Sequence, residues 1–257
     1  VINYFEGNPL FNAGIGATCT VEGTFELDAS IMEGKDLSAG AVAGLKHVKH
    51  PINAAYAVKT KSPHVMLSGA GAEEFAKEQG LEMVEDNMYF ATPKTMEWIE
   101  KLKQESKKNG TVGCVVLDKQ GNLTAGTSTG GMFKKRWGRI GDSPVIGAGT
   151  YADNNSCAVS CTGHGEYFIR HAVAFDVCAR YKYLKESVEK AADYIIHTEL
   201  NTNAGNGGLI AVDKLGNIAM PYNSGGMFRG FLYKEKGSPE IKKGCGIGKK
   251  IVVVGEK

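Results

Sequence analysis

A short internal repeat is the feature that most restricts how this 257-residue chain can fold. The sequence Asp-Lys-Gln-Gly-Asn at 118–122 recurs 95 positions later as Asp-Lys-Leu-Gly-Asn at 213–217. With the same offset, Gly-Gly-Met-Phe at 130–133 recurs at 225–228. Asp, Asn and Gly are typical of tight turns, and strand-like apolar residues flank both copies. The repeat therefore predicts two β-hairpins of one design, one after the other along the chain.

The rest of the chain predicts a mixture of strands and helices. The N-terminal part predicts, in order, a strand over 24–32, its return strand over 39–48, a helix over 51–59, a buried strand over 64–67, a helix over 72–79 and a helix that Thr92 caps and Pro93 begins. The polar stretch 105–110 is the best candidate for a boundary. After it the pattern predicts a strand over 111–117, its return over 123–128, a glycine-rich loop over 130–149, a strand over 157–161, helices over 166–184 and 187–200, a hairpin over 209–224 and a strand-like tail around 251–254.

The composition is that of an ordinary globular protein. Hydrophobic residues make up 42% and charged residues 23%, and the formal net charge is +2. This balance gives no reason to expect nucleic acid or an anionic membrane as a partner. No apolar run approaches the roughly 18–20 residues that cross a bilayer. We therefore expect no membrane and no nucleic acid among its partners.

Cysteine and histidine spacing argues against a metal cluster or a disulfide framework. The six cysteines include no Cys-x-x-Cys pair, and most lie in apolar surroundings, so we expect buried, reduced thiols. The six histidines show no paired spacing of the kind that binds zinc. Without a disulfide pattern the default compartment is the cytoplasm.

Thr111 is the first candidate for chemistry. The repeat offset places it on Asn206, so only the first hairpin begins with a threonine. If the bond between Gly110 and Thr111 were cut, the hydroxyl of Thr111 would lie beside its own free α-amine. An α-amine has an ordinary pKa of about 7.7–8.0 and can therefore serve as the base that activates the hydroxyl. The alternative is that Thr111 is only a β-branched residue at the start of a strand.

Two further patterns suggest groups that could serve this hydroxyl. Hydroxyl residues followed by glycines occur at 127–131 and at 160–165, and strand ends of this kind can aim a hydroxyl and a backbone N–H at one small volume, as in an oxyanion hole. Arg139 and Asp142 lie three positions apart in one loop. They could bind the carboxylate and the ammonium of an amino acid, or they could form ordinary turn and surface ion-pair contacts.

Several of these segments together resemble a known family. They are Asn-Gly-Thr-Val-Gly at 109–113, Thr-Ser-Thr-Gly-Gly at 127–131, Gly-Arg-Ile-Gly-Asp-Ser-Pro at 138–144, Thr-Gly-His-Gly-Glu at 162–166, Pro-Leu-Phe-Asn-Ala-Gly-Ile-Gly at 9–16 and Glu-Leu-Asp-Ala at 26–29. In order and spacing, from about Phe5 to Tyr233, they are similar to the plant-type L-asparaginase/isoaspartyl aminopeptidase family. The resemblance implies an N-terminal-nucleophile hydrolase of the α+β class with a four-layer αββα fold. It also implies a precursor that cuts itself before the catalytic threonine, giving an α subunit of residues 1–110 and a β subunit of residues 111–257 that together form one domain.

The resemblance also implies roles for individual residues. Thr111 would be the nucleophile, freed by cleavage after Gly110, and Thr129 would be its hydrogen-bonding neighbour. The oxyanion hole would consist of Thr162 and the Gly163 N–H. Arg139 and Asp142 would clamp the substrate, Gly165 would contribute backbone, and Asn12 would lie near the nucleophile. A sodium-binding loop is implied at Phe5, Glu6, Asn8, Phe11, Ala13 and Ile15, mostly through backbone carbonyls, with no organic cofactor.

One departure from the family pattern concerns the N-terminus. The family begins with a strand, a His-Gly-Gly-Ala-Gly turn and a long helix before the segment that matches Phe5, and none of these is present in this sequence. We therefore expect either an N-terminal segment outside this sequence or a shortened member whose sheet lacks a strand. The catalytic motifs are intact in both cases.

The leading functional hypothesis is hydrolysis of L-asparagine and of β-aspartyl dipeptides through an ester on Thr111, by a dimer of αβ units (a heterotetramer). The sister enzyme glycosylasparaginase is the nearest alternative, and the loop at 11–14 favours the asparaginase branch. A protease of the threonine aspartase type fits the segment 141–144 less well. A member without activity that serves as a scaffold or binding protein also remains open.

Overall fold

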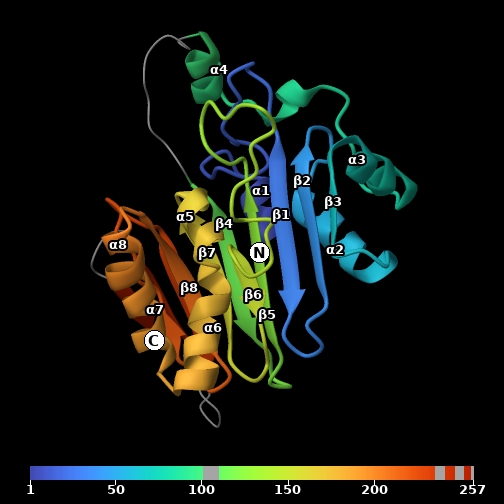
Figure 1. Ribbon diagram of the computed structural model, residues 1–257. Coiled ribbons are helices and arrows are strands. Elements are labelled where there is room, and N and C mark those ends of the chain that lie inside the picture. Colours follow the sequence, from blue (N-terminus) through green and yellow to red (C-terminus); the bar gives the residue numbers. More distant parts are fainter. Residues whose placement is uncertain (101–109, 235–240, 247–251, 256–257) are drawn as a thin grey trace.

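The computed structural model describes residues 1–100, 110–234, 241–246 and 252–255. It is a mixed α+β protein in which helices flank two main sheets (Figure 1). The class predicted from the sequence is therefore confirmed. The residues 101–109, which include most of the predicted polar boundary, lie outside the described part of the chain.

The first main sheet has five strands in the order β3-β2-β1-β5-β4. The strands are β1 (Leu27–Glu33), β2 (Ala39–Leu45), β3 (Met66–Ser68), β4 (Val112–Leu117) and β5 (Leu123–Thr129). Four of them pair antiparallel, whereas β3 joins the edge parallel to β2. The prediction that 64–67 is a buried strand was wrong, because β3 is short and lies at an edge where Met66 is exposed. Edge position, which periodicity does not reveal, decides this exposure.

The second main sheet has four strands and holds the second hairpin. Its order is β6-β7-β8-β9, formed by β6 (Thr150–Ala152), β7 (Cys157–Gly163), β8 (Gly207–Asp213) and β9 (Ile218–Ala219). A smaller antiparallel sheet contains β10 (Arg229–Lys234), β11 (Ile241–Gly246) and β12 (Val252–Gly255). The predicted strand-like tail is thus a strand over part of its length.

The two predicted turns of the repeat have the same local structure. The Asp118 carboxylate accepts hydrogen bonds from the backbone N–H of Gln120 and Asn122. Asp213 accepts equivalent bonds from Leu215 and Asn217. The shared aspartate therefore closes both hairpins, but β4–β5 lies in the first sheet and β8–β9 in the second.

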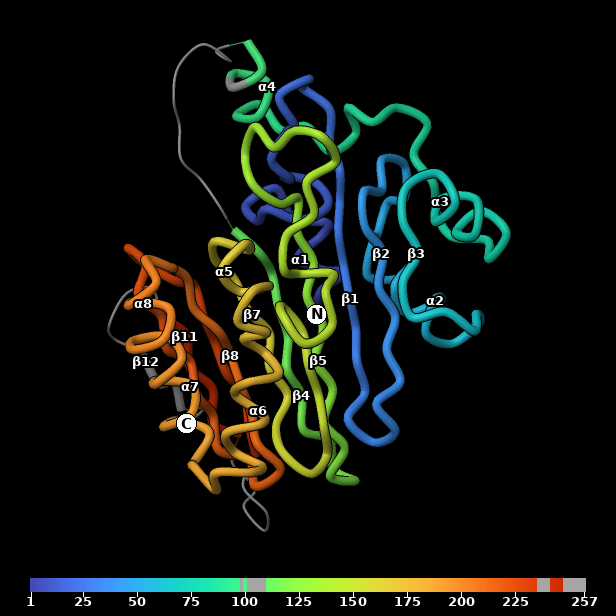
Figure 2. Tube along the Cα trace, viewed as in Figure 1, coloured from blue at the N-terminus to red at the C-terminus, as the bar shows by residue number. Residues whose placement is uncertain are grey.

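Helices cover the outer face of each main sheet. The helical elements are α1 (Ile2–Glu6), α2 (Pro51–Lys61), α3 (Gly69–Glu78), the 3-10 turn η1 (Asn87–Phe90), α4 (Pro93–Glu100), α5 (Gly165–Arg170), α6 (Val173–Leu184), α7 (Val188–Tyr194), the π turn η2 (Ile195–Glu199) and α8 (Leu200–Thr202). Figure 2 shows α2 and α3 beside β2 and β3, which they contact, while α6 and α7 contact the second sheet. Within the described part of the chain, no helix is both long and apolar enough to cross a membrane.

The helix predicted over 166–184 is in fact two helices. Ala172 has φ 45°, a left-handed conformation, and it separates α5 from α6. The helical periodicity continues across this residue, so the sequence pattern does not reveal the break. The predicted cap at Thr92 is present, because its hydroxyl accepts a bond from the Thr95 N–H at 3.1 Å.

Most of the cysteines are buried free thiols, as predicted. The buried ones are Cys19, Cys157, Cys161 and Cys178, whereas Cys114 is half-buried and Cys245 on β11 is exposed. The exposed thiol departs from the expectation because β11 belongs to the smaller sheet, in which β10 and β11 bury few side chains.

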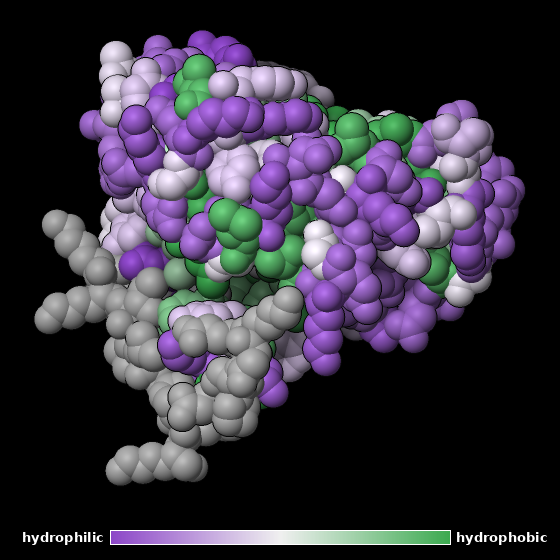
Figure 3. Space-filling model, turned by 90° about the horizontal axis from the view of Figure 1, so that it is seen from below, coloured by the Kyte–Doolittle hydropathy of each residue, from purple (hydrophilic) through white to green (hydrophobic). Residues whose placement is uncertain are grey.

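Side chains between the two main sheets are arranged in successive layers. Strands β4 and β5 contact β7, and β5 and β1 contact β6. One layer is apolar and contains Met32, Ala125, Ala152 and Ala158. Two residues further along each strand the side chains are hydroxyls, and beyond them lie the predicted catalytic residues. Figure 3 shows apolar residues in the middle of one end of the molecule, with hydrophilic residues above and to the right of them.

The contact between α2 and β2 depends on a glycine. A β-carbon on Gly40 would clash with the carbonyl of Ala55 and lie 2.6 Å from the backbone nitrogen of Lys59, and both residues belong to α2. We therefore expect Gly40→Ala to destabilise the protein by about 1–3 kcal/mol, the usual cost of overpacking. The measurement is the urea midpoint. Gly71→Ala in α3 is the control, because its β-carbon meets open space and alanine is the better helix former. Equal midpoints for the two variants would contradict this account.

Candidate active site

The predicted nucleophile lies beside its predicted neighbour. Thr111 immediately precedes β4, and antiparallel pairing of β4 with β5 places Val112 opposite Ser128. This register brings the Thr111 hydroxyl within 3.3 Å of the Thr129 hydroxyl, to which it donates. The Gly131 N–H donates to the same Thr129 oxygen at 3.0 Å and orients it.

The carbonyl oxygen of Gly110 accepts two hydrogen bonds. Thr129 Oγ1 donates at 3.0 Å and Asn12 Nδ2 donates at 2.6 Å. The Asn12 amide is held in this orientation, because its Oδ1 accepts from the Thr18 N–H and its Nδ2 also donates to Gly131 O. Two fixed donors therefore polarise the peptide carbonyl just before Thr111, and stabilise an oxyanion if one forms there.

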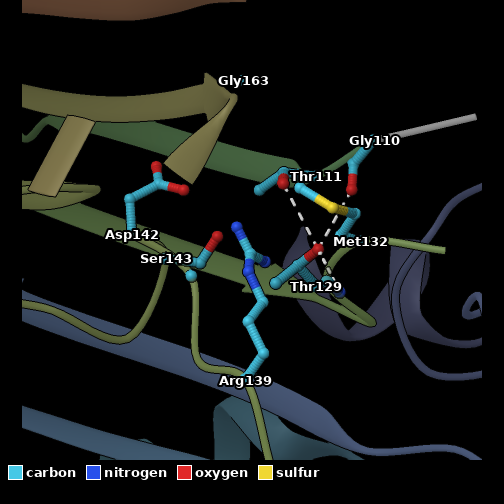
Figure 4. A pocket seen from close by; sticks show the side chains of 10 residues that line it. Gly110, Thr111, Thr129, Met132, Arg139, Asp142, Ser143 and Gly163 are labelled. Atoms are coloured by element: carbon cyan, nitrogen blue, oxygen red, sulfur yellow. Dashed lines mark hydrogen bonds between the residues drawn. The ribbon is translucent and has the colours of Figure 1, made fainter. Parts of the chain in front are cut away.

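A narrow cleft brings most of the predicted catalytic and substrate-binding residues together. Its lining comprises Gly110, Thr111, Thr129, Gly131, Met132, Arg139, Gly141, Asp142, Ser143 and Gly163. Figure 4 shows Thr111 and Thr129 on one side of it, with Arg139 and Asp142 reaching in from the loop before β6. The predicted nucleophile and the predicted clamp therefore face one volume, although they are far apart in the sequence.

Three predicted site residues adjoin the cleft rather than line it. Asn12 contacts it through the Gly110 carbonyl, and Thr162 directly precedes Gly163 at the end of β7. A β-carbon on Gly165 would lie 2.9 Å from both Arg139 Nη2 and Asp142 Oδ1. Only glycine at this position lets the two clamp residues approach the backbone so closely.

Glu166 is a residue of the site to which sequence reasoning assigned no role. Its carboxylate accepts two hydrogen bonds from Arg139, at 2.9 Å from Nε and 3.0 Å from Nη2. These bonds hold the pKa of Glu166 below its usual value. The only signal in the sequence was its place directly after Gly165. The pair shows that the guanidinium of Arg139 has the bidentate geometry that a carboxylate needs.

Two buried carboxylates lie in or beside the cleft. Burial raises the pKa of Asp142 to about 7, and Oδ2 of this residue has no hydrogen-bond partner among the described residues. Burial also raises the pKa of Asp28, which lies opposite Thr129 in the pairing of β1 with β5. A buried carboxylate without a full set of partners favours binding of a cation. Sequence analysis noted Asp28 in a motif but gave it no place in the site.

The predicted ion-binding loop closes on itself. Within the segment that runs from Phe5 to Ile15, the Ile15 N–H donates to the Glu6 carbonyl at 2.8 Å, which brings the two ends of the segment together. The Asn8 N–H donates to the Phe5 carbonyl, and the Phe11 N–H to the Asn8 carbonyl. Among the residues that the structure describes, no group of three or more His, Cys, Asp or Glu side chains could hold a metal ion.

The fold and this cleft define a hydrolase class in which a threonine hydroxyl is the candidate nucleophile. A family model described as asparaginase matches residues 1–241. The chain is 49% identical to an isoaspartyl peptidase of Salmonella typhimurium, covering 90% of this chain and 78% of that protein. It is 44% identical to the isoaspartyl peptidase of Escherichia coli, with 92% and 81% covered, and 41% identical to the isoaspartyl peptidase/L-asparaginase of Homo sapiens, with 86% and 74% covered. This protein therefore belongs to the asparaginase family, as its motifs predicted.

The raised pKa of Asp142 predicts a pH-dependent stability. A carboxyl whose pKa is higher in the folded than in the unfolded protein loses stabilisation as pH rises from about 4 to about 7. Asp142→Asn mimics the protonated form, so its gain in the free energy of unfolding over the natural protein should grow between pH 5 and pH 7 and be level above pH 8. Urea unfolding at several pH values measures this gain.

The control is Asp118→Asn, in the exposed turn of the first hairpin. Backbone hydrogen bonds lower the pKa of Asp118, so this residue stays ionised across the same range. Its replacement should change stability by the same amount at every pH from 5 to 8. A pH-independent effect at position 142 as well would show that the buried carboxyl does not titrate near neutrality.

Proposed function

We propose that this protein is a self-cleaving amidohydrolase that hydrolyses L-asparagine to aspartate and ammonia and cleaves β-aspartyl dipeptides. The single observation that most supports this proposal is the cleft, in which the Thr111 hydroxyl is hydrogen-bonded to Thr129 and faces Arg139 and Asp142. The isoaspartyl peptidases at 44–49% identity support the same substrate class.

Self-cleavage would begin with attack of the Thr111 hydroxyl on the carbonyl carbon of Gly110. Thr129 accepts a hydrogen bond from the Thr111 hydroxyl, and the proton that this hydroxyl loses is delivered to the amide nitrogen. Thr129 and Asn12 donate to the oxygen on which negative charge develops. The C–N bond then breaks and the nitrogen becomes the α-amine of Thr111. Water hydrolyses the resulting ester, leaving chains 1–110 and 111–257 and a free hydroxyl. The same two groups thus serve the precursor before any substrate binds.

Substrate hydrolysis would use the freed α-amine as the base. The Thr111 oxygen attacks the side-chain carbonyl of asparagine, and the amine takes the hydroxyl proton and delivers it to the leaving nitrogen. Thr162 and the Gly163 N–H, at the end of β7 where Gly163 lines the cleft, would bind the oxyanion. Ammonia or an amino acid leaves, and water then releases aspartate from Thr111.

The substrate clamp would select an amino acid with both α-groups free. Glu166 occupies the Nε–Nη2 edge of the Arg139 guanidinium, so the α-carboxylate of the substrate would bind the other edge of this planar fork, formed by Nη1 and Nη2. Asp142, buried and with an unpartnered oxygen, suits the α-ammonium. With both groups held, the side-chain amide is the bond that faces Thr111.

We also propose the finer architecture that the family resemblance implies. The contacts between the two main sheets and the helices on their outer faces support a four-layer αββα arrangement. After cleavage the α and β subunits would remain one domain, and two αβ units would form a dimer. The closed loop from Phe5 to Ile15 would hold a sodium ion through backbone carbonyls. Its neutral oxygen donors suit a hard monovalent ion, whose part would be to stiffen the backbone beside Asn12.

The role of Thr111 is tested by its replacement. The natural protein should appear as two chains in mass spectrometry, with a new N-terminus at Thr111. Thr111→Ala removes the hydroxyl and should remain one chain without activity, because no acyl group can be transferred. Asn12→Ala should slow cleavage by about 10²–10³-fold through loss of one oxyanion donor. Two fragments from Thr111→Ala, or an active single chain, would overturn the mechanism, and a stable uncleaved natural protein would favour a scaffold.

The clamp is tested by substrate choice. N-acetylasparagine lacks the ammonium that Asp142 would bind, so it should be hydrolysed at least about tenfold less efficiently than asparagine, the factor that corresponds to 1.4 kcal/mol. Arg139→Lys keeps the charge but loses the planar fork, and should raise KM for asparagine. Ammonia release measures both effects. Equal use of the two substrates would refute the clamp.

A further inference from the structure

Four buried hydroxyls form one layer between the two main sheets, next to the predicted catalytic residues Thr129 and Thr162. Ser30 on β1 lies opposite Thr127 on β5, and Thr150 on β6 lies opposite Ser160 on β7. All four are at most 3% exposed. Two residues along each strand, on the side away from the cleft, the next layer of side chains is apolar. We call Ser30, Thr127, Thr150 and Ser160 the hydroxyl layer.

The four side chains of the hydroxyl layer form a continuous chain of hydrogen bonds across the two sheets. The Ser30 and Thr150 oxygens are 2.8 Å apart, those of Thr150 and Thr127 are 2.5 Å apart, and those of Thr127 and Ser160 are 2.7 Å apart. Gly113 on β4 makes room for this chain, because a β-carbon there would clash with the Ser160 hydroxyl. A buried network of this kind is stable only when its members are fully paired.

The hydroxyl layer binds the backbone of the loop that carries the clamp. Ser30 Oγ donates to the Ser143 carbonyl at 2.6 Å, and Thr150 Oγ1 lies 3.3 Å from the same oxygen. Thr127 Oγ1 lies 3.3 Å from the Gly149 carbonyl. Ser143 directly follows Asp142. Because Oδ2 of Asp142 has no partner in the described part of the chain, the position of its carboxylate depends on the backbone on which it lies.

We propose that the hydroxyl layer is a positioning device for substrate binding: through the Ser143 carbonyl it holds Asp142 where the α-ammonium of the substrate must bind. The inference rests on the proposed clamp and extends it to residues that do not touch substrate. It also explains why this layer is polar although the next one is apolar. Side chains of similar size without hydroxyls would fill the space but would leave the Ser143 carbonyl unpaired.

The test removes one hydroxyl at a time and separates binding from turnover. Ser30→Ala deletes the hydroxyl that donates to the Ser143 carbonyl, and Thr150→Val deletes the hydroxyl that bonds to Ser30 and lies 3.3 Å from the same carbonyl oxygen. We expect KM for asparagine to rise about threefold to tenfold, the range for loss of one hydrogen bond, while kcat changes less than about twofold. Thr150→Ser retains the hydroxyl and should keep KM near the natural value. Cleavage into two chains should proceed in all three variants.

A matched control distinguishes a positioning role of the hydroxyl layer from a purely structural one. Ser156 is also buried and also donates its hydroxyl to a backbone carbonyl, that of Cys178 at 2.7 Å, but it lies at the far end of β7 from the cleft. Ser156→Ala should lower the melting temperature about as much as Ser30→Ala and leave KM unchanged. The inference is overturned if KM is unchanged in both Thr150→Val and Ser30→Ala, or if Ser156→Ala raises KM equally.

Arg139→Lys separates this inference from the proposed function. If Arg139→Lys leaves KM for asparagine unchanged, the clamp itself fails and the positioning role falls with it. If Arg139→Lys raises KM but Thr150→Val and Ser30→Ala do not, the clamp holds and only the positioning role is wrong. A rise in KM in all three, with rescue by Thr150→Ser, supports both.

Discussion

The pairing of β4 with β5 is the interaction on which the site depends. It places Thr111 at a strand end beside Thr129, and it brings the carbonyl of Gly110 to the donors of Thr129 and Asn12. A slip of one residue in this register would turn the Thr111 side chain to the opposite face of the sheet. The hairpin turn at Asp118 sets the register, so a turn at one end of the sheet determines the position of Thr111, the predicted nucleophile, at the other.

Buried polar side chains, both carboxylates and hydroxyls, are the second constraint on the structure. Asp142 and Asp28 are carboxylates with an unpartnered oxygen, and such groups lower stability unless they are neutral or bind a cation. The hydroxyl layer shows the opposite arrangement, in which every side chain is paired. A layer of fully hydrogen-bonded hydroxyls thus lies next to a site whose buried carboxylates each have an oxygen without a hydrogen-bond partner among the described residues. In the proposed mechanism, the incompletely paired carboxylate of Asp142 binds the ammonium of the substrate and the paired layer fixes the backbone beside it.

Local sequence patterns predicted most elements of the fold, but not their burial or breaks. The paired turns of the repeat, the cap at Thr92 and the strands around the hairpins agree with the structure, because each depends on residues close together in the chain. The expected burial of 64–67 was wrong, since an edge strand depends on what lies beside it. The expected single helix over 166–184 was wrong because Ala172 adopts a left-handed conformation where α5 turns into α6.

The sequence by itself determined the candidate nucleophile Thr111, the preceding Gly110 and the predicted clamp residues Arg139 and Asp142, since short motifs with fixed spacing contain them. Only the tertiary structure decided that Glu166 binds Arg139, that Asp28 lies opposite Thr129, and that hydroxyls from four separate strands form one layer, two of which contact the carbonyl of Ser143. Each of these contacts joins residues far apart in the chain. Their distance and orientation come from strand register and from the packing of one sheet on the other, which no local pattern encodes.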